Sequence, residues 1–316
     1  MLDDFLVSLD PRVLQYGLQM LKLCIWLVLL AAIFTPLEQL FALHPSKIFR
    51  KGFVTDLGYY FVSSFVPALF LSVPLGFVAW CVHRFIPASF ISMMAGLPFI
   101  VRVAGALVVG EIGYYWGHRW SHEIPFLWRF HAIHHSAEHI DYLVNTRTHP
   151  VDMVFTRLCE MIPMYVLGLT SPLTASGSLI PVLVLLLGTF WGFFIHANVK
   201  WRFGFLEWLV ATPGFHHWHH TNDGPAYINK NYASMLPGID VLFGTMYLPK
   251  DKTPGCYGID APMPPGLVRQ LVEPFVFRPE NPDSISVEVK TEDAAGQSLA
   301  DMSRGEKDES LTGVQG

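Results

Sequence analysis

The chain has 316 residues, of which 52% are hydrophobic and only 15% are charged, and its formal net charge is −5. Because a soluble globular domain is about 25% charged, this composition argues against a soluble enzyme. A disordered regulator would combine low hydrophobicity with a high net charge, so that class is excluded as well. The composition favours an integral membrane protein.

Five apolar stretches are long enough to cross a bilayer, since a spanning helix needs about 20 mostly apolar residues. They cover residues 13–34, 53–82, 97–115, 151–169 and 179–195. The fourth stretch contains Arg157 and Glu160, and charged residues at such depths usually face a cavity or extend toward the membrane surface. We therefore predict an all-α membrane bundle of four to five spans.

The loop between the first two stretches is basic, with Lys47, Arg50 and Lys51. The positive-inside rule places this loop in the cytosol. The following stretches then form two hairpins, and each hairpin returns the chain to the same side. We therefore expect a helical, histidine-rich cap on the cytosolic face, beyond the ends of the spans.

Three clusters of histidines follow these spans. Side chains three or four residues apart share one face of a helix, and imidazole is a good ligand for iron, zinc, copper and nickel. A single histidine is more often a hydrogen-bonded core residue, but repeated pairs at helical spacing predict a site that can close around two metal ions. The clusters are His118 with His122, then His131 with His134 and His135, then His216 and His217 with His219 and His220.

The order of these motifs, HxxxH, HxxHH and a second HxxHH, resembles the fatty acid hydroxylase/sterol desaturase superfamily of membrane di-iron oxygenases. The segment EIGYYWGHR at residues 111–119 is similar to the family's entry to its first motif, with Glu111 where Asp is commoner. Residues 231–249 are similar to the family's closing segment. The resemblance covers about residues 97–250.

The resemblance implies nine metal ligands, because His196 matches an additional family histidine at the end of the last span. It also implies two iron ions, O2 as co-substrate and a lipid substrate. The implied ligands are His118, His122, His131, His134, His135, His196, His216, His219 and His220.

Five further histidines have no assigned role in metal binding. His217 is an extra imidazole within the third motif. For His139 and His149 the sequence leaves three alternatives: an additional ligand, a hydrogen-bond partner of a ligand, or a surface or capping residue. We expect His44 and His83 to lie at the membrane interface.

A histidine that binds a metal usually donates its other ring N–H to a carboxylate or a carbonyl. Glu111, two helical turns before His118, and Asp223, three residues after His220, are the candidate carboxylates. Asp141 and Arg147, beside the second motif, are further candidates.

These motifs predict an oxidoreductase that hydroxylates a lipid C–H bond. A lipid desaturase with the same site is an alternative, and so, from another class, is a membrane metal-binding or transport protein. A transporter would place its ligands at mid-membrane on broken helices, and a hydrolase with one zinc ion needs only about three protein ligands. The sequence contains no GxGxxG motif that opens a helix, so we expect a ferredoxin, a cytochrome or a flavin reductase to supply electrons.

We expect four segments along the chain. Residues 1–96 carry the first spans and the basic loop, 97–250 the catalytic domain and 251–277 an extension. Residues 278–316 are predicted to be a disordered tail, whose nine acidic and four basic side chains account for the net charge of −5. No part of the chain has the basic surface that nucleic-acid binding requires.

Overall fold

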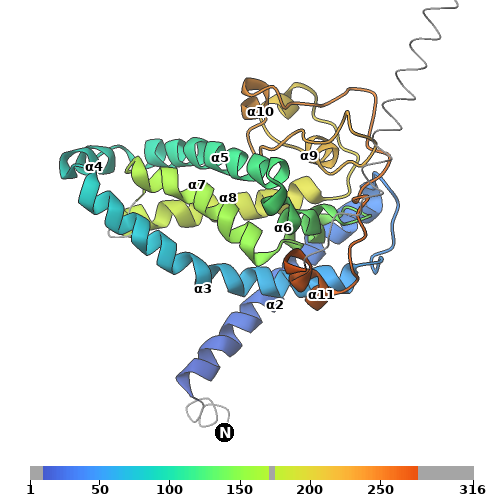
Figure 1. Ribbon diagram of the computed structural model, residues 1–316, viewed down its shortest axis with the longest axis horizontal. Helices are drawn as coiled ribbons and strands as arrows, with labels where there is room; N and C mark the ends of the chain where they lie inside the picture. Colours follow the sequence, from blue (N-terminus) through green and yellow to red (C-terminus); the bar gives the residue numbers. More distant parts are fainter. Residues whose placement is uncertain (1–9, 171–174, 277–316) are drawn as a thin grey trace, which may run out of the picture. The chain divides into compact units, whose positions relative to one another are not determined.

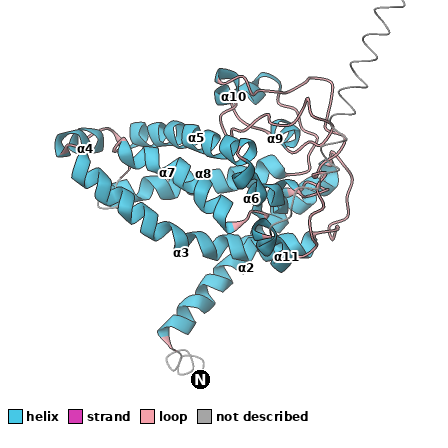
Figure 2. Cartoon of the chain, in the orientation of Figure 1, coloured by secondary structure: helices cyan, strands magenta, loops and turns pink. Residues whose placement is uncertain are grey.

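The structure, a computed structural model, describes residues 10–170 and 175–276, and its regular elements there are helices (Figure 2). Residues 1–274 form one compact unit, to which the description below refers; the predicted tail at 278–316 lies outside the described residues. The helices are α2 (Pro11–Phe41), α3 (Phe53–Phe85), α4 (Ala88–Ala95), α5 (Phe99–Glu123), α6 (Pro125–His135), η1 (Tyr142–Thr146), α7 (Pro150–Val166), α8 (Ala175–His196), η2 (Gly204–Trp208), α9 (Pro213–His219), α10 (Gly238–Leu242), α11 (Leu267–Val272) and η3 (Glu273–Phe275).

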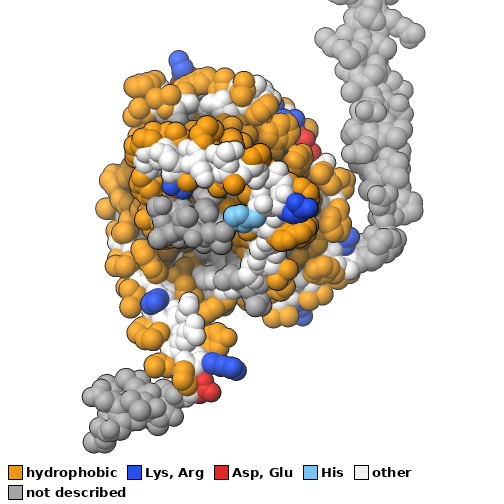
Figure 3. Space-filling model, turned by 90° about the vertical axis from the view of Figure 1, so that its left-hand side faces the viewer, with side chains coloured by type: hydrophobic (Ala, Val, Ile, Leu, Met, Phe, Trp, Pro, Cys, Tyr) orange, Lys and Arg blue, Asp and Glu red, His pale blue; other side chains and the backbone are white. Residues whose placement is uncertain are grey.

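Within residues 10–170 and 175–276, four helices are long and apolar enough to cross a membrane, namely α2, α3, α5 and the Leu179–His196 part of α8. They correspond to four of the five predicted spans. Figure 1 shows α3, α5, α7 and α8 alongside one another, with α4 at the opposite end of the bundle from α6 and α9. The face at the α4 end is covered mainly by hydrophobic side chains (Figure 3), as expected for a surface in contact with lipid.

The fifth expected span is a helix, α7, but it is not among the four candidate spans. It has 17 residues, which extend only about 25 Å, and it carries Asp152, Arg157 and Glu160. Asp152 and Glu160 are buried inside the bundle. The helix therefore supplies polar side chains to the interior of the bundle, where its charged residues find partners, rather than a surface for lipid.

Helices α5 and α7 pack closely because glycines line their contact. A Cβ atom placed on Gly113 would lie 2.1 Å from the carbonyl oxygen of Cys159, and one on Gly117 would lie 2.8 Å from the Cβ atom of Cys159. Small residues allow two helix backbones in a membrane to approach in this way. The close contact brings the start of α7 next to the histidine-bearing end of α5.

The short helices at this end begin with proline, a residue favoured at the first helical position. Pro125, Pro150 and Pro213 start α6, α7 and α9. The preceding residues cap two of them, because His149 Nδ1 accepts a hydrogen bond from Val151 and Thr212 Oγ1 accepts one from Phe215. These start signals determine which histidines become helical.

The basic loop lies at the same end of the bundle as the histidines. Arg50 forms ion pairs with Asp141 (2.6 Å) and with Asp56 of α3 (2.8 Å), and Arg147 also pairs with Asp56. These side chains are almost entirely buried, and buried charges are tolerated only when they are paired. The basic loop and the histidine clusters therefore lie at the same end of the bundle, whereas the side of the membrane on which this end lies stays a prediction.

Candidate metal centre

The nine histidines that the resemblance names lie in two groups. Within each group the candidate ligand atoms all lie within 4.8 Å of one another. No other cluster of at least three His, Cys, Asp or Glu side chains with this spacing occurs in the part of the chain that the structure describes. The first group is His118, His122, His131, His135 and His219, and the second is His134, His196, His216 and His220.

Helix geometry explains this division. Each pair of histidines four residues apart stays within one group, because these positions share a helix face. His134 and His135 are consecutive on α6 and belong to different groups, since consecutive side chains point about 100° apart. Helix α6 therefore lies between the two groups and contributes to both, as does α9.

The outer ring nitrogen of several histidines is held by a hydrogen bond to an oxygen. This bond sets the orientation of each ring, so that Nε2 points toward the other members of its group. The acceptors are Tyr232 O for His118 (2.7 Å), Arg147 O for His134 (3.1 Å), Gly192 O for His196 (2.7 Å), Lys230 O for His219 (2.8 Å) and Asp152 Oδ2 for His131 (2.9 Å).

The inward nitrogens fit metal ions. The Nε2 atoms of His118, His122 and His131 are buried without a hydrogen-bond partner, and such atoms require an explanation because buried polar groups are nearly always satisfied. In the second group the Nε2 atom of His196 lies 3.0 Å from that of His216 and 3.2 Å from that of His220. This separation is about that of neighbouring ligand atoms around one ion with metal–nitrogen distances of about 2.1 Å.

Five histidines of α6 and of the segment 216–220 have a pKa that favours the neutral form. Burial lowers the pKa of each well below its usual value, and the neighbouring imidazoles lower it further. Neutral imidazole is the form that binds metal ions, so these side chains can act as ligands at neutral pH. The residues concerned are His134, His135, His216, His219 and His220.

The carboxylate that orients a histidine is Asp152, which the sequence analysis missed. It is buried in the first turn of α7, accepts a hydrogen bond from Ser121 Oγ (2.9 Å) and contacts His131 Nδ1. The sequence contained one signal for this position. Pro150, 15 residues after the second motif, marks a helix start, which puts Asp152 in the first turn of a helix.

The two carboxylates proposed for this role bind elsewhere. Glu111 accepts hydrogen bonds from Ser234 Oγ (2.9 Å) and from the backbone N–H groups of Met235 and Leu236. It therefore anchors the segment at 234–236 to α5. No hydrogen bond from Glu111 to an imidazole is present among the described residues.

Asp223 lies at the protein surface, where the chain leaves α9. It accepts hydrogen bonds from the backbone N–H groups of Gly255 and Cys256. Asp223 thus attaches the segment at 255–256 to the chain that follows α9, and its hydrogen bonds among the described residues are not to an imidazole.

The remaining histidines lie outside both groups. His217 contacts the hydroxyl group of Tyr257 (3.0 Å) through Nδ1, and His139 is exposed. His149 caps α7, and its Nε2 contacts Leu271 O. His44 contacts Pro254 O, and His83 is exposed at the far end of α3.

Asp141 and Arg147 act on the framework of the site. Asp141 pairs with Arg50, whereas Arg147 pairs with Asp56 and supplies the carbonyl that orients His134. Arg147 therefore links the buried ion pair with Asp56 to His134 of the second histidine group.

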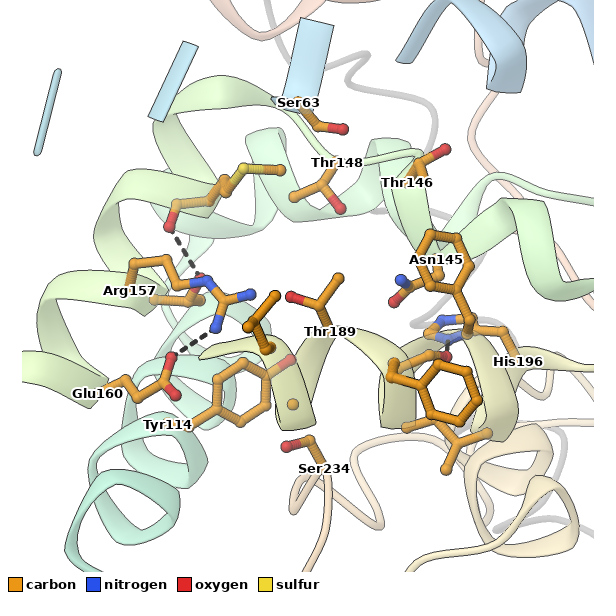
Figure 4. A pocket seen from close by; sticks show the side chains of 18 of the residues that line it. Ser63, Tyr114, Asn145, Thr146, Thr148, Arg157, Glu160, Thr189, His196 and Ser234 are labelled. Atoms are coloured by element: carbon orange, nitrogen blue, oxygen red, sulfur yellow. Dashed lines mark hydrogen bonds and ion pairs between the residues drawn. The ribbon is translucent and has the colours of Figure 1, made fainter. Parts of the chain in front are cut away.

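A cavity of about 600 Å³ extends from the histidines into the bundle. His131, His134, His196 and His216 lie at one end, and side chains of α2, α3, α5, α7 and α8 form the walls. Figure 4 shows His196 on one side and Arg157 on the other, with Thr189 between them. Ligand sites of about 300–1,000 Å³ are typical for small molecules, so the cavity has room for part of a lipid.

Residues 103–245 match the fatty acid hydroxylase family. The match covers a little under half of the chain, and we refer to residues 103–245 as the hydroxylase domain after the family they are similar to. All nine histidines of the two groups lie within this hydroxylase domain, whereas α2 and α3 precede it.

The hydroxylase domain also has individual relatives. The chain is 35% identical over 179 residues to ornithine lipid hydroxylase OlsE of Rhizobium tropici, a match that covers 56% of this chain and 51% of the relative. It is 34% identical over 154 residues to alkylglycerol monooxygenase of Homo sapiens, covering 48% of this chain and 32% of the relative. It is 30% identical over 145 residues to a very-long-chain aldehyde decarbonylase of Oryza sativa subsp. indica, covering 43% and 22%.

The chain thus spans about half the length of the bacterial relative and a third or less of the other two. No solved structure matches the chain.

Proposed function

We propose that this protein is a membrane-embedded, O2-dependent lipid hydroxylase that binds two iron ions, one in each histidine group. The observation that carries this proposal is the pair of buried imidazole groups at the end of a cavity lined by membrane-spanning helices. The matches to a lipid hydroxylase and to a monooxygenase support oxidation as the reaction.

In this proposal the side chains of the protein bind the two iron ions, orient the ligands and shield the site from water. The first group would hold one ion through five imidazoles and the second group the other through four. With O2 and external electrons, bound iron supplies the oxidising power that an unactivated C–H bond requires. Asp152 orients His131, and the walls of the cavity position the lipid and keep bulk water away from the centre.

The metal centre lies at the ends of the helices rather than at mid-membrane. His118 and His122 are in the last turns of α5, and His196 is the final residue of α8. A transporter would bind its ion near the middle of the bilayer. We propose that this end faces the cytosol, where a ferredoxin, a cytochrome or a flavin reductase can deliver electrons.

The proposal is tested by mass spectrometry of lipids from cells that express the wild-type protein or the His135→Ala variant. We expect a lipid that gains one oxygen atom only with the wild-type protein. A lipid that loses two hydrogen atoms instead would identify a desaturase. Identical lipid profiles in both cell lines, with the protein present in the membrane and iron bound, would refute the assignment.

A further inference from the structure

The cavity holds an ion pair that the metal centre does not use. Arg157 Nη1 contacts Glu160 Oε2 at 2.7 Å, one turn apart on α7, and both side chains line the cavity. Charged side chains within the bundle are costly unless they serve a function. The pair is separate from the buried network around Asp56, which ties the basic loop to the bundle.

The two partners differ in what they present to the cavity. The side chain of Glu160 is only 8% exposed, whereas that of Arg157 is 26% exposed. The hydrogen bond with Glu160 engages Nη1 alone, and a guanidinium group has five N–H donors in a planar fork. The remaining edge of Arg157 is therefore open to a ligand, and Figure 4 shows this group directed toward the middle of the cavity.

Polar side chains continue the wall around this group. Tyr114 of α5, Thr189 of α8 and Ser234 carry hydroxyl groups that line the same part of the cavity. Such groups donate hydrogen bonds to oxygen atoms of a ligand, as the fork of an arginine does to carboxylate or phosphate. Ser234 Oγ already donates to Glu111, so an alkyl chain alone would leave the hydroxyl groups of Tyr114 and Thr189 and the open edge of Arg157 without a hydrogen-bond partner.

The opposite part of the wall is apolar and borders the lipid phase. Trp26 of α2 and Leu186 and Phe190 of α8 line the cavity and are at the same time 55%, 58% and 47% exposed. An acyl chain can therefore pass from the bilayer into the cavity between α2 and α8. The cavity combines one polar anchor with an apolar side entrance.

We propose that Arg157 binds an anionic group of the lipid substrate, a carboxylate or a phosphate, and so selects acidic lipids for the reaction. This inference rests on the proposed function, because the bound lipid is a substrate only if the protein oxidises it. The binding itself can be measured without turnover. Glu160 holds the guanidinium in place by one edge.

The position of Arg157 also limits where the lipid reacts. Asp152, which contacts His131, precedes Arg157 by five residues on α7, a separation of about 7.5 Å along the helix axis. The C–H bond that reacts therefore lies between the anionic group at Arg157 and the histidines, which line the same cavity.

The test measures equilibrium binding of four lipids to the purified, full-length protein in detergent: an N-acyl amino acid, its methyl ester, phosphatidic acid and diacylglycerol. We expect the wild-type protein to bind at least one acid about tenfold or more tightly than its neutral counterpart. An increase of about this size is what one hydrogen bond to a charged group adds to affinity. Which acid it is distinguishes a carboxylate from a phosphate. Equal binding of acids and neutral lipids would overturn the proposal.

The two single variants should change the affinity for the acidic lipid in opposite directions. Glu160→Gln removes a competing negative charge and should tighten binding of the acid, whereas Arg157→Gln should abolish the preference. Because Arg157→Gln leaves Glu160 buried without its partner, the double variant Arg157→Gln/Glu160→Gln restores a neutral hydrogen-bonded pair and must also lose the preference. Arg84→Gln, an exposed position at the end of α3, is the control and should bind like the wild type.

The same samples separate this inference from the proposed function. If the acid binds through Arg157 but no lipid is oxidised with iron, O2 and a reductant, the proposed function fails and the binding site remains. If lipids are oxidised but the double variant keeps the preference for acids, the proposed function remains and the role of Arg157 is wrong.

Discussion

His135 contacts His219 across the first histidine group, with their Nε2 atoms 3.1 Å apart. Replacing His135 with alanine removes one of five imidazoles from that group. We expect the His135→Ala variant, and likewise His118→Ala, to lose activity and to bind less iron, as measured by elemental analysis of the purified protein. His139→Ala is the matched control, because His139 lies four residues further on and is exposed; it should retain both.

Full activity together with full iron content in His135→Ala or His118→Ala would contradict the assignment of the first group. Loss of iron in His139→Ala would show instead that the whole segment is sensitive to substitution.

Asp152 orients His131 through a 2.9 Å contact and is itself held by Ser121. Asp152→Asn keeps the size of the side chain but removes its negative charge. We expect iron affinity or activity to fall about 10- to 100-fold, as is typical for residues that orient a metal ligand. Titration with iron measures the effect, and Glu138→Gln, which affects only an exposed pair with Lys51, should not change it.

Unaltered iron affinity and activity in Asp152→Asn would show that backbone packing alone holds His131. In that case the hydrogen bond would be a consequence of the fold and not a requirement of the site.

At the residue scale, the sequence predicted which histidines gather but not how they divide. Helical spacing assigns His118 and His122 to one face, and it separates His134 from His135. It cannot show that His134 meets His196 while His135 meets His219, because these contacts join segments more than 60 residues apart. Asp152 is only 21 residues from His131, but it was missed because tertiary packing, and not helical spacing, brings α7 against α6.

At the element scale, the contact between α5 and α7 depends on Gly113. A Cβ atom there would lie 2.1 Å from the carbonyl oxygen of Cys159, so the helix backbones must move apart. We expect Gly113→Ala to destabilise the protein by about 1–3 kcal/mol, measured as a lower thermal unfolding temperature in detergent. The shift should also weaken iron binding, because α7 carries Asp152 to the metal centre.

Gly76→Ala is the matched control on α3, where a new Cβ atom has no heavy atom within 4 Å. Alanine is favoured over glycine in a helix by about 0.5–1 kcal/mol, so this variant should be as stable as the wild type or more so. Equal stability of Gly113→Ala and Gly76→Ala would show that α5 and α7 are not in the close contact described.

The elements themselves were predictable to different degrees. Apolar length predicted α2, α3, α5 and α8 as spans, and proline and capping residues marked the starts of the short helices. For α7 the hydrophobic stretch indicated a span, whereas Arg157 and Glu160 indicated a cavity. The second indication was the better guide, because a helix surrounded by other helices can carry charges that lipid would not accept.

At the scale of the whole molecule, the net charge of −5 is concentrated in residues 278–316, beyond the hydroxylase domain at 103–245. We expect deletion of 278–316 to leave activity and iron content within about twofold of the wild type, measured on purified protein, because these residues lie outside the matched segment and contain none of the nine histidines. An inactive but folded truncation would assign the tail a part in catalysis or electron delivery.

The central claim is that buried histidines hold iron that inserts oxygen into a lipid. The most direct measurement supplies isotopically labelled O2 and a reductant to the purified, iron-loaded protein with a membrane lipid extract, and follows the products by mass spectrometry. The account predicts a lipid that carries one labelled oxygen atom and is absent when His135 is replaced by alanine. A product whose new oxygen comes from water, or no oxidised lipid from a protein that holds its iron, would contradict it.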